Sequence, residues 1–453
     1  MTNNCHLLIV GFDEIVANKY MEVVLKCIQE GIVSGYSIID LCGQERRIEK
    51  WIGETEAKPD ACYYMPYSAC KNGIKIDEQS FKRIVFQLID KNMNLKVYIA
   101  TEASSHEYYL RFFMSKGISV LSEKPVICPM KDGQFDPIRI TPIMKELCTY
   151  LNIYHNRCSV MNFDRYHKLF YDKVYEPVKR LVDTEGSPIT SIHIKQCGGV
   201  WNTHKEFDTR TDHPYKYGYG MLMHGGYHYI DLAAQFLKIN KDLYANIPLS
   251  LSFVTYMANP MDQESRIGSS PSNLINDIRT ENDLCGPGYG ETDFVTILKL
   301  SNMNTHAVIT LGSICLEQTT TSIRNWEIIP EGQYNKNGRV SDIELDVSVS
   351  VVHRTHLHSY DMPTNIACNV DSLKTNVRIS TWNNISLLPE ENAYEEKEFC
   401  NIHHSDGNKQ VLYKWLHNDD NRSTFESHLL TMEMVQSIAL SMKQPGKEIR
   451  MVL

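Results

Sequence analysis

The first 150 residues show short apolar runs that alternate with segments of helical spacing. HLLIVG at 6–11 has the pattern of a buried strand that stops at a glycine, and EIVANKYMEVVLKCIQ at 14–29 places its apolar residues on one helical face. Strands alternating with helices on this spacing predict a parallel sheet with crossover helices. Further strand patterns cover 34–40, 94–101 and 118–125, and a helix is predicted over 104–117, with Ser104 or Ser105 as N-cap and Gly117 as its stop.

After about residue 155 the pattern changes to period two, which is typical of strands with one buried face. The segment 292–313 is predicted as two strands joined at SNMN. Other period-two patterns cover 189–199, 342–359 and 375–383, and an amphipathic helix is predicted over 423–443, before Pro445 and Gly446. The predicted fold class is therefore α/β plus α+β, with a parallel sheet in 1–150 and a large, open, mostly antiparallel sheet in 151–453.

Composition restricts the partners. Of the 453 residues, 42% are apolar and 22% are charged, which is the balance of a globular protein of two or three domains. The net charge of 46 − 55 = −9 makes nucleic acid a poor partner, and a mean hydropathy of −0.32 argues against a membrane span. The start lacks a secretory signal, and the 13 cysteines include no CxxC pair, so we expect a cytoplasmic protein with reduced thiols.

A dinucleotide site is suggested weakly by the turn after the first strand. Of the motif G-x-G-x-x-G/A, Gly11-Phe12-Asp13 retains only Gly11, and Asp13 at the second glycine position would crowd and repel a pyrophosphate. Asp40 ends the second strand and could accept the ribose hydroxyls of NAD, whereas Arg46 and Arg47 could instead favour NADP. We expect NAD as the cofactor, with NADP as the alternative.

Residues 97–126 carry a more specific pattern. A strand ends in Ala100-Thr101, His106 follows at the start of the next helix, then Gly117, a short strand and Glu123-Lys124-Pro125. This order resembles the Gfo/Idh/MocA oxidoreductase family. The resemblance continues in GYGMLMHGGYHYIDLAAQFL at 218–237 and, more loosely, in NFDRYHKLF at 162–170.

The resemblance implies a Rossmann domain followed by a sheet domain that can mediate a homodimer or homotetramer. It also implies an NAD(P)-dependent enzyme acting on a hydroxyl-bearing carbon of a sugar, nucleotide sugar or cyclitol. The chain is longer than is usual for the family, and the excess is predicted at 256–291 and 314–422. The implied residues are Lys124, His228 and His224 for catalysis; Gly11, Phe12, Asp13, Asp40, Thr101, His106, Glu123, Lys124 and Pro125 for the cofactor; and Arg165, Tyr166, Tyr227 and Asp231 for the substrate.

Hydride transfer from an alcohol needs a base for the hydroxyl proton, and the resemblance assigns this role to Lys124, with His228 as a second acid/base. His224 stands where the family has an Asp, so the chain either uses a histidine pair or has altered or lost its chemistry. Two alternatives therefore stay open: an NAD-using glycosidase and a non-catalytic NAD-binding regulator. His353, His356 and His358 invite a metal site, but we expect no metal, because residues 353 and 356 lie on opposite faces of a strand.

Overall fold

The computed structural model describes residues 4–453 except 54–55, 57, 71–72, 93, 199–200, 203, 211–212, 268–287, 319–322, 325–341, 362–374, 401 and 403–404. The chain divides into two compact units. Unit 1 comprises Met1–His167 and His404–Met432, and unit 2 comprises Lys168–His403 and Glu433–Leu453. This division differs from the predicted boundary at residue 150, because a segment from late in the chain belongs to unit 1.

Unit 1 is built on a six-stranded, wholly parallel sheet in the order β10-β7-β6-β1-β2-β3. The chain therefore adds β2 and β3 on one side of β1 and then adds β6, β7 and β10 on its other side. This is the doubly wound order of a Rossmann sheet. The strands are β1 Cys5–Val10, β2 Val33–Leu41, β3 Ala61–Met65, β6 Leu95–Ile99, β7 Ser119–Ser122 and β10 Ser159–Val160.

Helices cover both faces of this sheet. One face packs against the helix of 14–29 and against α11, and apolar side chains of β1 and β2 fill the space between them. The other face carries α3 and α4, which are joined by a cluster of edge-on aromatic rings centred on Phe81. The helices of unit 1 are η1 Val16–Tyr20, α1 Met21–Gln29, α2 Glu45–Gly53, α3 Glu78–Lys91, α4 Ala103–Met114, η2 Pro137–Arg139, α5 Ile140–Tyr154, η3 Asp164–Tyr166, α11 Ser405–His417 and η7 Glu426–His428.

The late segment is held in unit 1 by both apolar and polar contacts. Trp415 and Leu416 of α11 are buried in the core that β1 and α1 form. The Lys96 ammonium donates to the main-chain oxygens of Trp415 at 2.5 Å and Leu416 at 3.0 Å, and it also donates to Asn418 Oδ1 at 2.9 Å. These bonds satisfy carbonyls at the helix end that have no partner within the helix. Burial lowers the pKa of Lys96 to about 8.

Unit 2 is built on a nine-stranded sheet in the order β20-β19-β18-β17-β11-β15-β14-β13-β21, in which only β11 and β15 pair in parallel. The mostly antiparallel sheet predicted from the period-two segments is thus confirmed. Its strands are β11 Ile189–Cys197, β13 Leu249–Ala258, β14 Asp293–Asn302, β15 Val308–Glu317, β17 Asp342–Val349, β18 His353–Asp361, β19 Thr375–Asn383, β20 Tyr394–Cys400 and β21 Ile449–Val452.

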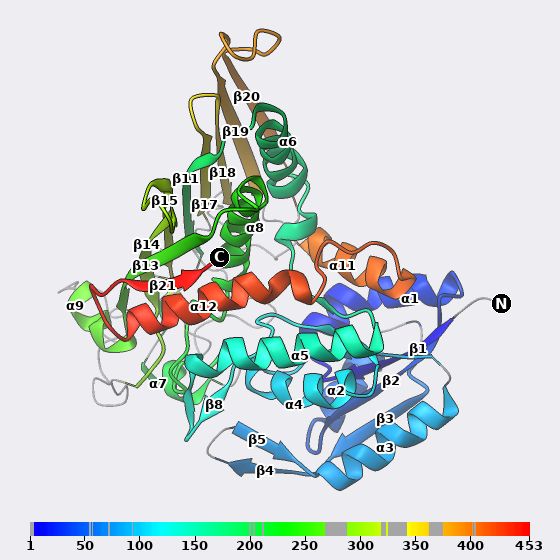
Figure 1. The fold of residues 1–453 in the computed structure, drawn as a ribbon. Helices are drawn as coiled ribbons and strands as arrows, with labels where there is room; N and C mark the ends of the chain where they lie inside the picture. Colours follow the sequence, from blue (N-terminus) through cyan, green and yellow to red (C-terminus); the bar gives the residue numbers. More distant parts are fainter. Residues whose placement is uncertain are drawn as a thin grey trace. The chain divides into compact units, whose positions relative to one another are not determined.

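The two faces of this sheet differ. Helix α8 packs against β11 on one face, and α6 packs on α8 (Figure 1). The opposite face exposes large apolar side chains of β13, β14 and β15, namely Tyr256, Val295, Ile297 and Leu311. The remaining helices of unit 2 and of the C-terminal segment are η4 Phe170–Tyr175, α6 Glu176–Glu185, α7 His204–Thr209, α8 Tyr227–Leu243, η5 Pro260–Asp262, α9 Gln263–Ile267 and α12 Leu429–Met442.

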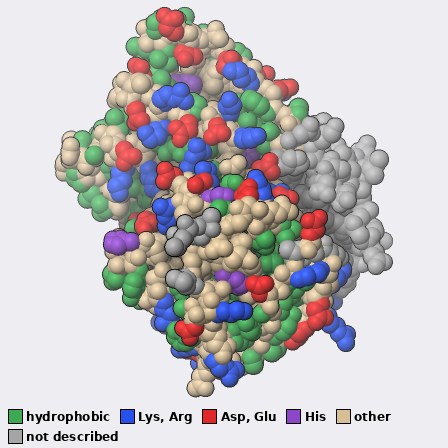
Figure 2. Space-filling view, turned by 90° about the vertical axis from the view of Figure 1, so that its right-hand side faces the viewer, with side chains coloured by type: hydrophobic (Ala, Val, Ile, Leu, Met, Phe, Trp, Pro, Cys, Tyr) green, Lys and Arg blue, Asp and Glu red, His purple; other side chains and the backbone are tan. Residues whose placement is uncertain are grey.

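Short two-stranded ladders complete the described structure. They are β4 Tyr67–Cys70 with β5 Gly73–Ile76, β8 Met130–Lys131 with β9 Gln134–Phe135, and β12 Trp201–Asn202 with β16 Ile323–Arg324. Among the described residues, no helix combines the length and the apolar character that crossing a membrane requires. On the face drawn in Figure 2, acidic and basic side chains are interspersed.

Three element boundaries differ from the prediction for local reasons. Helix α4 begins at Ala103, because the side chain of Glu102 caps it by accepting from Ser104 N at 2.6 Å, so neither serine is the N-cap. The period-two segment 342–359 forms two strands, because a turn at Ser350, with φ +44°, separates β17 from β18. The last helix begins at Leu429 rather than at 423, since Glu426–His428 forms a separate 3-10 turn.

The predicted insertions contain regular structure where the chain is described. Strands β17 to β20 extend the sheet of unit 2, and α11 belongs to unit 1. Much of the predicted insertion at 256–291 lies outside the described residues, and its described part includes the end of β13, η5 and α9.

Candidate functional site

The strand order of unit 1 creates a topological switch point between β1 and β6, where consecutive crossovers leave the sheet in opposite directions. In open parallel sheets, ligands bind at the carboxyl ends of the strands beside such a point. The sequence-predicted cofactor residues lie at those ends: Gly11 to Asp13 after β1, Asp40 in β2, Thr101 after β6, and Glu123 to Pro125 after β7.

Gly11 is required by the close approach of two chain segments. It has φ +85°, and a Cβ at this position would lie 2.8 Å from the main-chain oxygen of Ala100, at the end of β6. The Gly11 N–H donates to Ile39 O at 2.8 Å, and the Ala100 N–H donates to Val10 O at 2.8 Å. A side chain here would separate the two strand ends that form the switch point.

Asp13 caps the helix that follows β1. Its carboxylate accepts a hydrogen bond from Val16 N at 2.9 Å, and its main-chain oxygen accepts from Ala17 N at 3.0 Å. Amides of the first helical turn are the groups that would otherwise meet a pyrophosphate. The structure therefore explains how the chain accommodates an acid where the motif has glycine: the acid accepts from an amide of the first helical turn.

Asp40 ties the turn after β1 to the end of β2. Its two carboxylate oxygens accept from Phe12 N at 2.8 Å and from Leu41 N at 2.7 Å. Burial raises the pKa of Asp40, whereas these two amides and Arg47, whose Nη2 lies 4.0 Å from Oδ2, lower it. Each oxygen keeps a second lone pair, so the carboxylate can still accept from a ribose hydroxyl.

A partly buried acid precedes the predicted catalytic lysine. Glu123 Oε1 accepts a hydrogen bond from the Tyr98 hydroxyl at 2.7 Å, and burial raises the pKa of Glu123. Tyr98 packs edge-on against Tyr20 of the first crossover helix, with ring centroids 5.9 Å apart. The Lys124–Pro125 peptide bond is cis. The segment 123–125 is therefore anchored through Glu123 to the strand and helix beside the switch point.

His106 bridges the ends of β6 and β7. The side chain is buried, with Nε2 2.9 Å from Thr101 O and Nδ1 2.9 Å from Pro125 O. Burial lowers its pKa, while the carbonyl of Thr101, the charge of Glu102 and the carbonyl of Pro125 oppose that shift. His106 thus holds the peptide after Lys124 at a fixed separation from Thr101, and contact with a cofactor stays a prediction.

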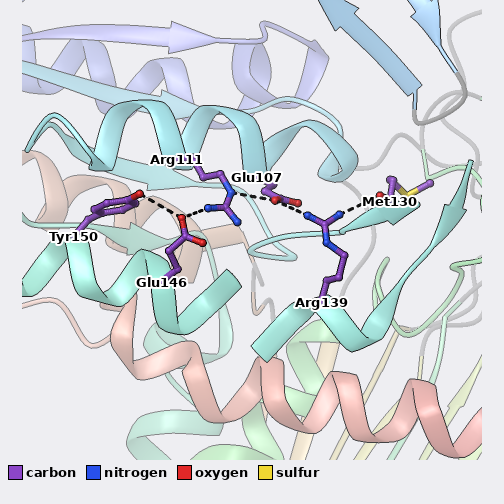
Figure 3. Close-up of polar contacts among 6 residues, drawn as sticks. All are labelled: Glu107, Arg111, Met130, Arg139, Glu146 and Tyr150. Atoms are coloured by element: carbon purple, nitrogen blue, oxygen red, sulfur yellow. Dashed lines mark hydrogen bonds and ion pairs between the residues drawn. The ribbon is translucent and has the colours of Figure 1, made fainter. Parts of the chain in front are cut away.

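Helix α4, which carries His106, is fixed to its neighbours by a chain of ion pairs (Figure 3). Glu107 Oε1 accepts from Arg111 Nε and from Arg139 Nη2, both at 3.0 Å. Arg111 also pairs with Glu146 of α5, and Arg139 donates to Met130 O at 3.2 Å. These contacts link α4 to α5, to the η2 turn and to β8.

Arg165 and Tyr166, predicted to bind substrate, lie against the late segment of unit 1. The buried Arg165 guanidinium donates to Arg422 O at 2.8 Å and to Ser427 Oγ at 2.9 Å. The Tyr166 hydroxyl accepts from Arg422 N at 2.7 Å. These bonds position residues 420–427, and substrate binding by the two side chains stays a prediction.

In unit 2, the predicted catalytic histidines lie in a tight turn and at the start of α8. The Gly220 oxygen accepts from Met223 N and His224 N, both at 3.0 Å, and Met221 O accepts from Gly226 N at 2.8 Å. The His224 ring packs edge-on against three rings: His213 and Tyr215, each with centroids 4.9 Å away, and Tyr219 at 5.6 Å. His224, the departure from the family pattern, is therefore part of an aromatic cluster.

His228 lies in the first turn of α8 and is 9% exposed. Tyr227 and Asp231, predicted to bind substrate, are fully buried on the same helix. The turn at 220–226 leads directly into this helix, so His224 lies just before the helix and His228 lies in its first turn. Their catalytic roles, and the substrate contacts of Tyr227 and Asp231, stay predictions.

Glu291 is a buried acid in this region that sequence reasoning missed. Its Oε1 accepts from Leu222 N at 2.7 Å, and its main-chain oxygen accepts from Met221 N at 2.9 Å. Burial raises the pKa of Glu291 to about 7, although amides of the turn lower it. Because Glu291 lies 69 residues from Leu222 and precedes β14 outside any motif, no local pattern could have identified it.

The histidines of the period-two region lie on the sheet of unit 2. His358 Nε2 is 2.9 Å from Asp342 Oδ1, and these two with Glu344 form a group whose spacing would allow a metal ion. The pKa of the neighbouring Lys195 is raised mostly by Cys197, and Glu317, Glu344 and Asp342 raise it further. A second such group in the described chain is Cys27, Glu30 and His417.

No model of a known protein family matches the chain, and no curated protein matches its sequence. In three dimensions, however, it is similar to the WlbA dehydrogenase from Bordetella pertussis, whose structure contains NADH and UDP-GlcNAcA, with 12% identity, a TM-score of 0.55 and full coverage of both chains. It is also similar to an oxidoreductase from Agrobacterium radiobacter in complex with NAD+, L-tartaric acid and magnesium, with 11% identity, a TM-score of 0.54 and 99% and 98% of the two chains covered.

A third similar structure is the aldose-aldose oxidoreductase from Caulobacter crescentus complexed with glycerol, with 10% identity, a TM-score of 0.53 and 99% and 100% coverage. At these identities the likeness shows a shared fold over the whole chain. The predicted fold class is therefore confirmed, and the solved structures that share it include dehydrogenases and oxidoreductases, the class of enzyme that the sequence motifs resemble.

Proposed function

We propose that this chain is an NAD-dependent oxidoreductase that moves a hydride to or from a hydroxyl-bearing carbon of a sugar, nucleotide sugar or cyclitol. The observation that carries the proposal is the set of side chains at the switch point of the unit 1 sheet. Gly11, Asp40 and Lys124 stand at or beside the carboxyl ends of three strands there. The solved structures of similar fold that contain NADH or NAD+ support the same cofactor for this chain.

The switch point fits a dinucleotide in most respects. Gly11 allows the ends of β1 and β6 to meet at the switch point, and the Asp40 carboxylate can accept from ribose hydroxyls. Asp40 would also repel the 2′-phosphate of NADP, so we propose NAD. Bound NAD would supply the nicotinamide ring that exchanges the hydride.

The chain's own residues would accept and donate the proton of the substrate hydroxyl. In the proposed mechanism, the Lys124 amine takes the proton of the substrate hydroxyl, and His228 serves as a second acid/base. Glu123 and His106 hold the lysine's segment through the Tyr98 hydroxyl and the Pro125 carbonyl. A base held at a fixed place next to the hydroxyl contributes through orientation as well as through proton affinity.

One observation favours a second candidate, a non-catalytic NAD-binding regulator of the same fold. The Asp13 carboxylate occupies an amide of the first helical turn, where it weakens the site for a pyrophosphate. A regulator that senses NAD needs only modest affinity and no turnover. In either case, we propose that the exposed apolar side chains of β13 to β15 form a contact between copies of the chain.

The first experiment is a titration of the purified protein with NADH, followed by NADH fluorescence, and then an assay on a panel of sugars, nucleotide sugars and cyclitols. The oxidoreductase proposal expects binding, turnover of a panel member, and loss of turnover in Lys124→Met with binding retained. Binding without turnover, together with a partner protein whose affinity depends on NAD, would favour the regulator. A fully active Lys124→Met variant would remove the role given to that residue.

A further inference from the structure

The segment Gly290–Glu291 lies directly against the turn that carries His224. A Cβ on Gly220 would lie 2.0 Å from Glu291 O, and a Cβ on Gly290 would lie 2.1 Å from the main chain of Tyr219. Real Cβ atoms do not approach other atoms this closely, so both glycines are needed for the contact. The two segments, far apart in sequence, are therefore packed main chain to main chain.

The 220–226 turn makes some of its main-chain hydrogen bonds internally and others to Glu291. The turn's own carbonyls, Gly220 O and Met221 O, accept the amides of residues 223, 224 and 226. Its first amides have no such partner within the turn, and Glu291 receives them: Met221 N on its main-chain oxygen and Leu222 N on its carboxyl group. Buried amides need acceptors, so removal of this carboxyl group leaves the Leu222 N–H without one.

We propose that Glu291 is a positioning residue of the proposed active site, holding the 220–226 turn so that His224 stays in its ring cluster and His228 stays in the first turn of α8. The proposal rests on the oxidoreductase function proposed above. A carboxyl group thus reaches the turn from the segment before β14.

Several charged or titratable groups belong to the segments that pack against this turn. His224 and His213 belong to the ring cluster. Tyr215, in the same cluster, interacts electrostatically with Arg210, Glu291 and Asp293. Asp293, on the same segment as Glu291, pairs with Arg266 at 2.6 Å. Asp293 is 6% exposed and Glu291 is 5% exposed, so Asp293→Asn is a matched control that removes an equally buried carboxylate outside the turn.

The test uses the full chain labelled with ¹³C at the histidine ring, with the His213, His224 and His228 signals assigned by single replacements. Glu291→Met removes the acceptor and is expected to shift the signals of His224 and His228. Glu291→Gln, whose amide oxygen can still accept from Leu222 N, and the control Asp293→Asn should shift these signals much less. If the panel yields a substrate, Glu291→Met should lower kcat by about 10- to 100-fold with little change in KM, as a displaced catalytic group does. Glu291→Gln should keep most of the turnover.

Unchanged histidine signals in a folded Glu291→Met protein would overturn the proposal. If that variant does not fold, the wild-type protein still decides: the Leu222 amide should be protected from hydrogen exchange by its bond to Glu291, and exchange as fast as that of an unprotected amide would contradict the proposal. Histidine signals that respond to Glu291→Met in a protein without turnover would uphold the positioning role and refute the oxidoreductase function.

Discussion

Gly11 provides a sharp test of how the switch point is built. Replacing it by Ala adds a Cβ 2.8 Å from Ala100 O at φ +85°. A side chain at positive φ costs about 1–2 kcal/mol, and a methyl group forced into a packed site costs about 1–3 kcal/mol more. Gly31→Ala is the matched control, because Gly31 has φ +73° but nothing within 4 Å of its Cβ position. The control shares the conformational cost and lacks the collision.

The difference between the two variants isolates the close approach of β1 and β6. For a unit of this size, each kcal/mol lowers Tm by about 2–4 °C, so Gly11→Ala should melt about 2–12 °C below Gly31→Ala. NADH affinity should fall at least about tenfold in Gly11→Ala, which corresponds to about 1.4 kcal/mol, and stay near the wild-type value in Gly31→Ala. Thermal melts and NADH fluorescence titrations measure both. Equal melting temperatures and equal NADH affinities in the two variants would refute this account of the turn.

Three further perturbations follow from the same contacts. Asp13→Gly should tighten NADH binding, because it removes a negative charge from the helix N-terminus, and weaker binding would contradict this. The loss of the cap should lower the free energy of unfolding by only about 0.3 kcal/mol, because glycine is itself a good N-cap residue. His106→Ala should lower turnover more than NADH affinity, because it frees the Pro125 carbonyl next to Lys124. Steady-state kinetics measure the turnover, and a separate NADH titration measures the affinity. The pKa of Glu291 is raised to about 7 from an ordinary 4.5, so the folded protein binds the proton more tightly than the unfolded chain does. The resulting contribution to the free energy of unfolding is complete below about pH 4.5 and is lost as pH rises through about 7. Wild type should therefore lose about 3 kcal/mol relative to Glu291→Gln across that window, and parallel pH profiles of the two melting curves would contradict it.

The sequence was sufficient for features that depend on local pattern. The apolar run of β1 and the helical spacing of 14–29 predicted the first crossover, and the period-two segments predicted the sheet of unit 2. A buried strand and an amphipathic helix are each encoded by neighbouring residues, so they can be recognised without the fold. The specific order of residues around Lys124 then located the end of β7.

What could not be predicted depends on contacts between distant residues. Asp13 conflicts with a glycine motif, and only the structure shows that it caps the following helix. Glu291 belongs to no motif, because its partners lie 69 residues earlier. The place of α11 in unit 1 depends on Trp415 and Lys96, whose contact spans more than 300 residues of sequence.

The central claim is that the switch point of unit 1 holds NAD next to a catalytic Lys124. The most direct measurement is the change in NADH absorbance on a panel of sugars, nucleotide sugars and cyclitols, with wild type, Lys124→Met and Lys116→Met in parallel. The account predicts turnover of a panel member by wild type and by Lys116→Met, and no turnover by a Lys124→Met protein that still binds NADH. Turnover that survives in Lys124→Met, or a wild-type protein that does not bind NADH, would contradict it.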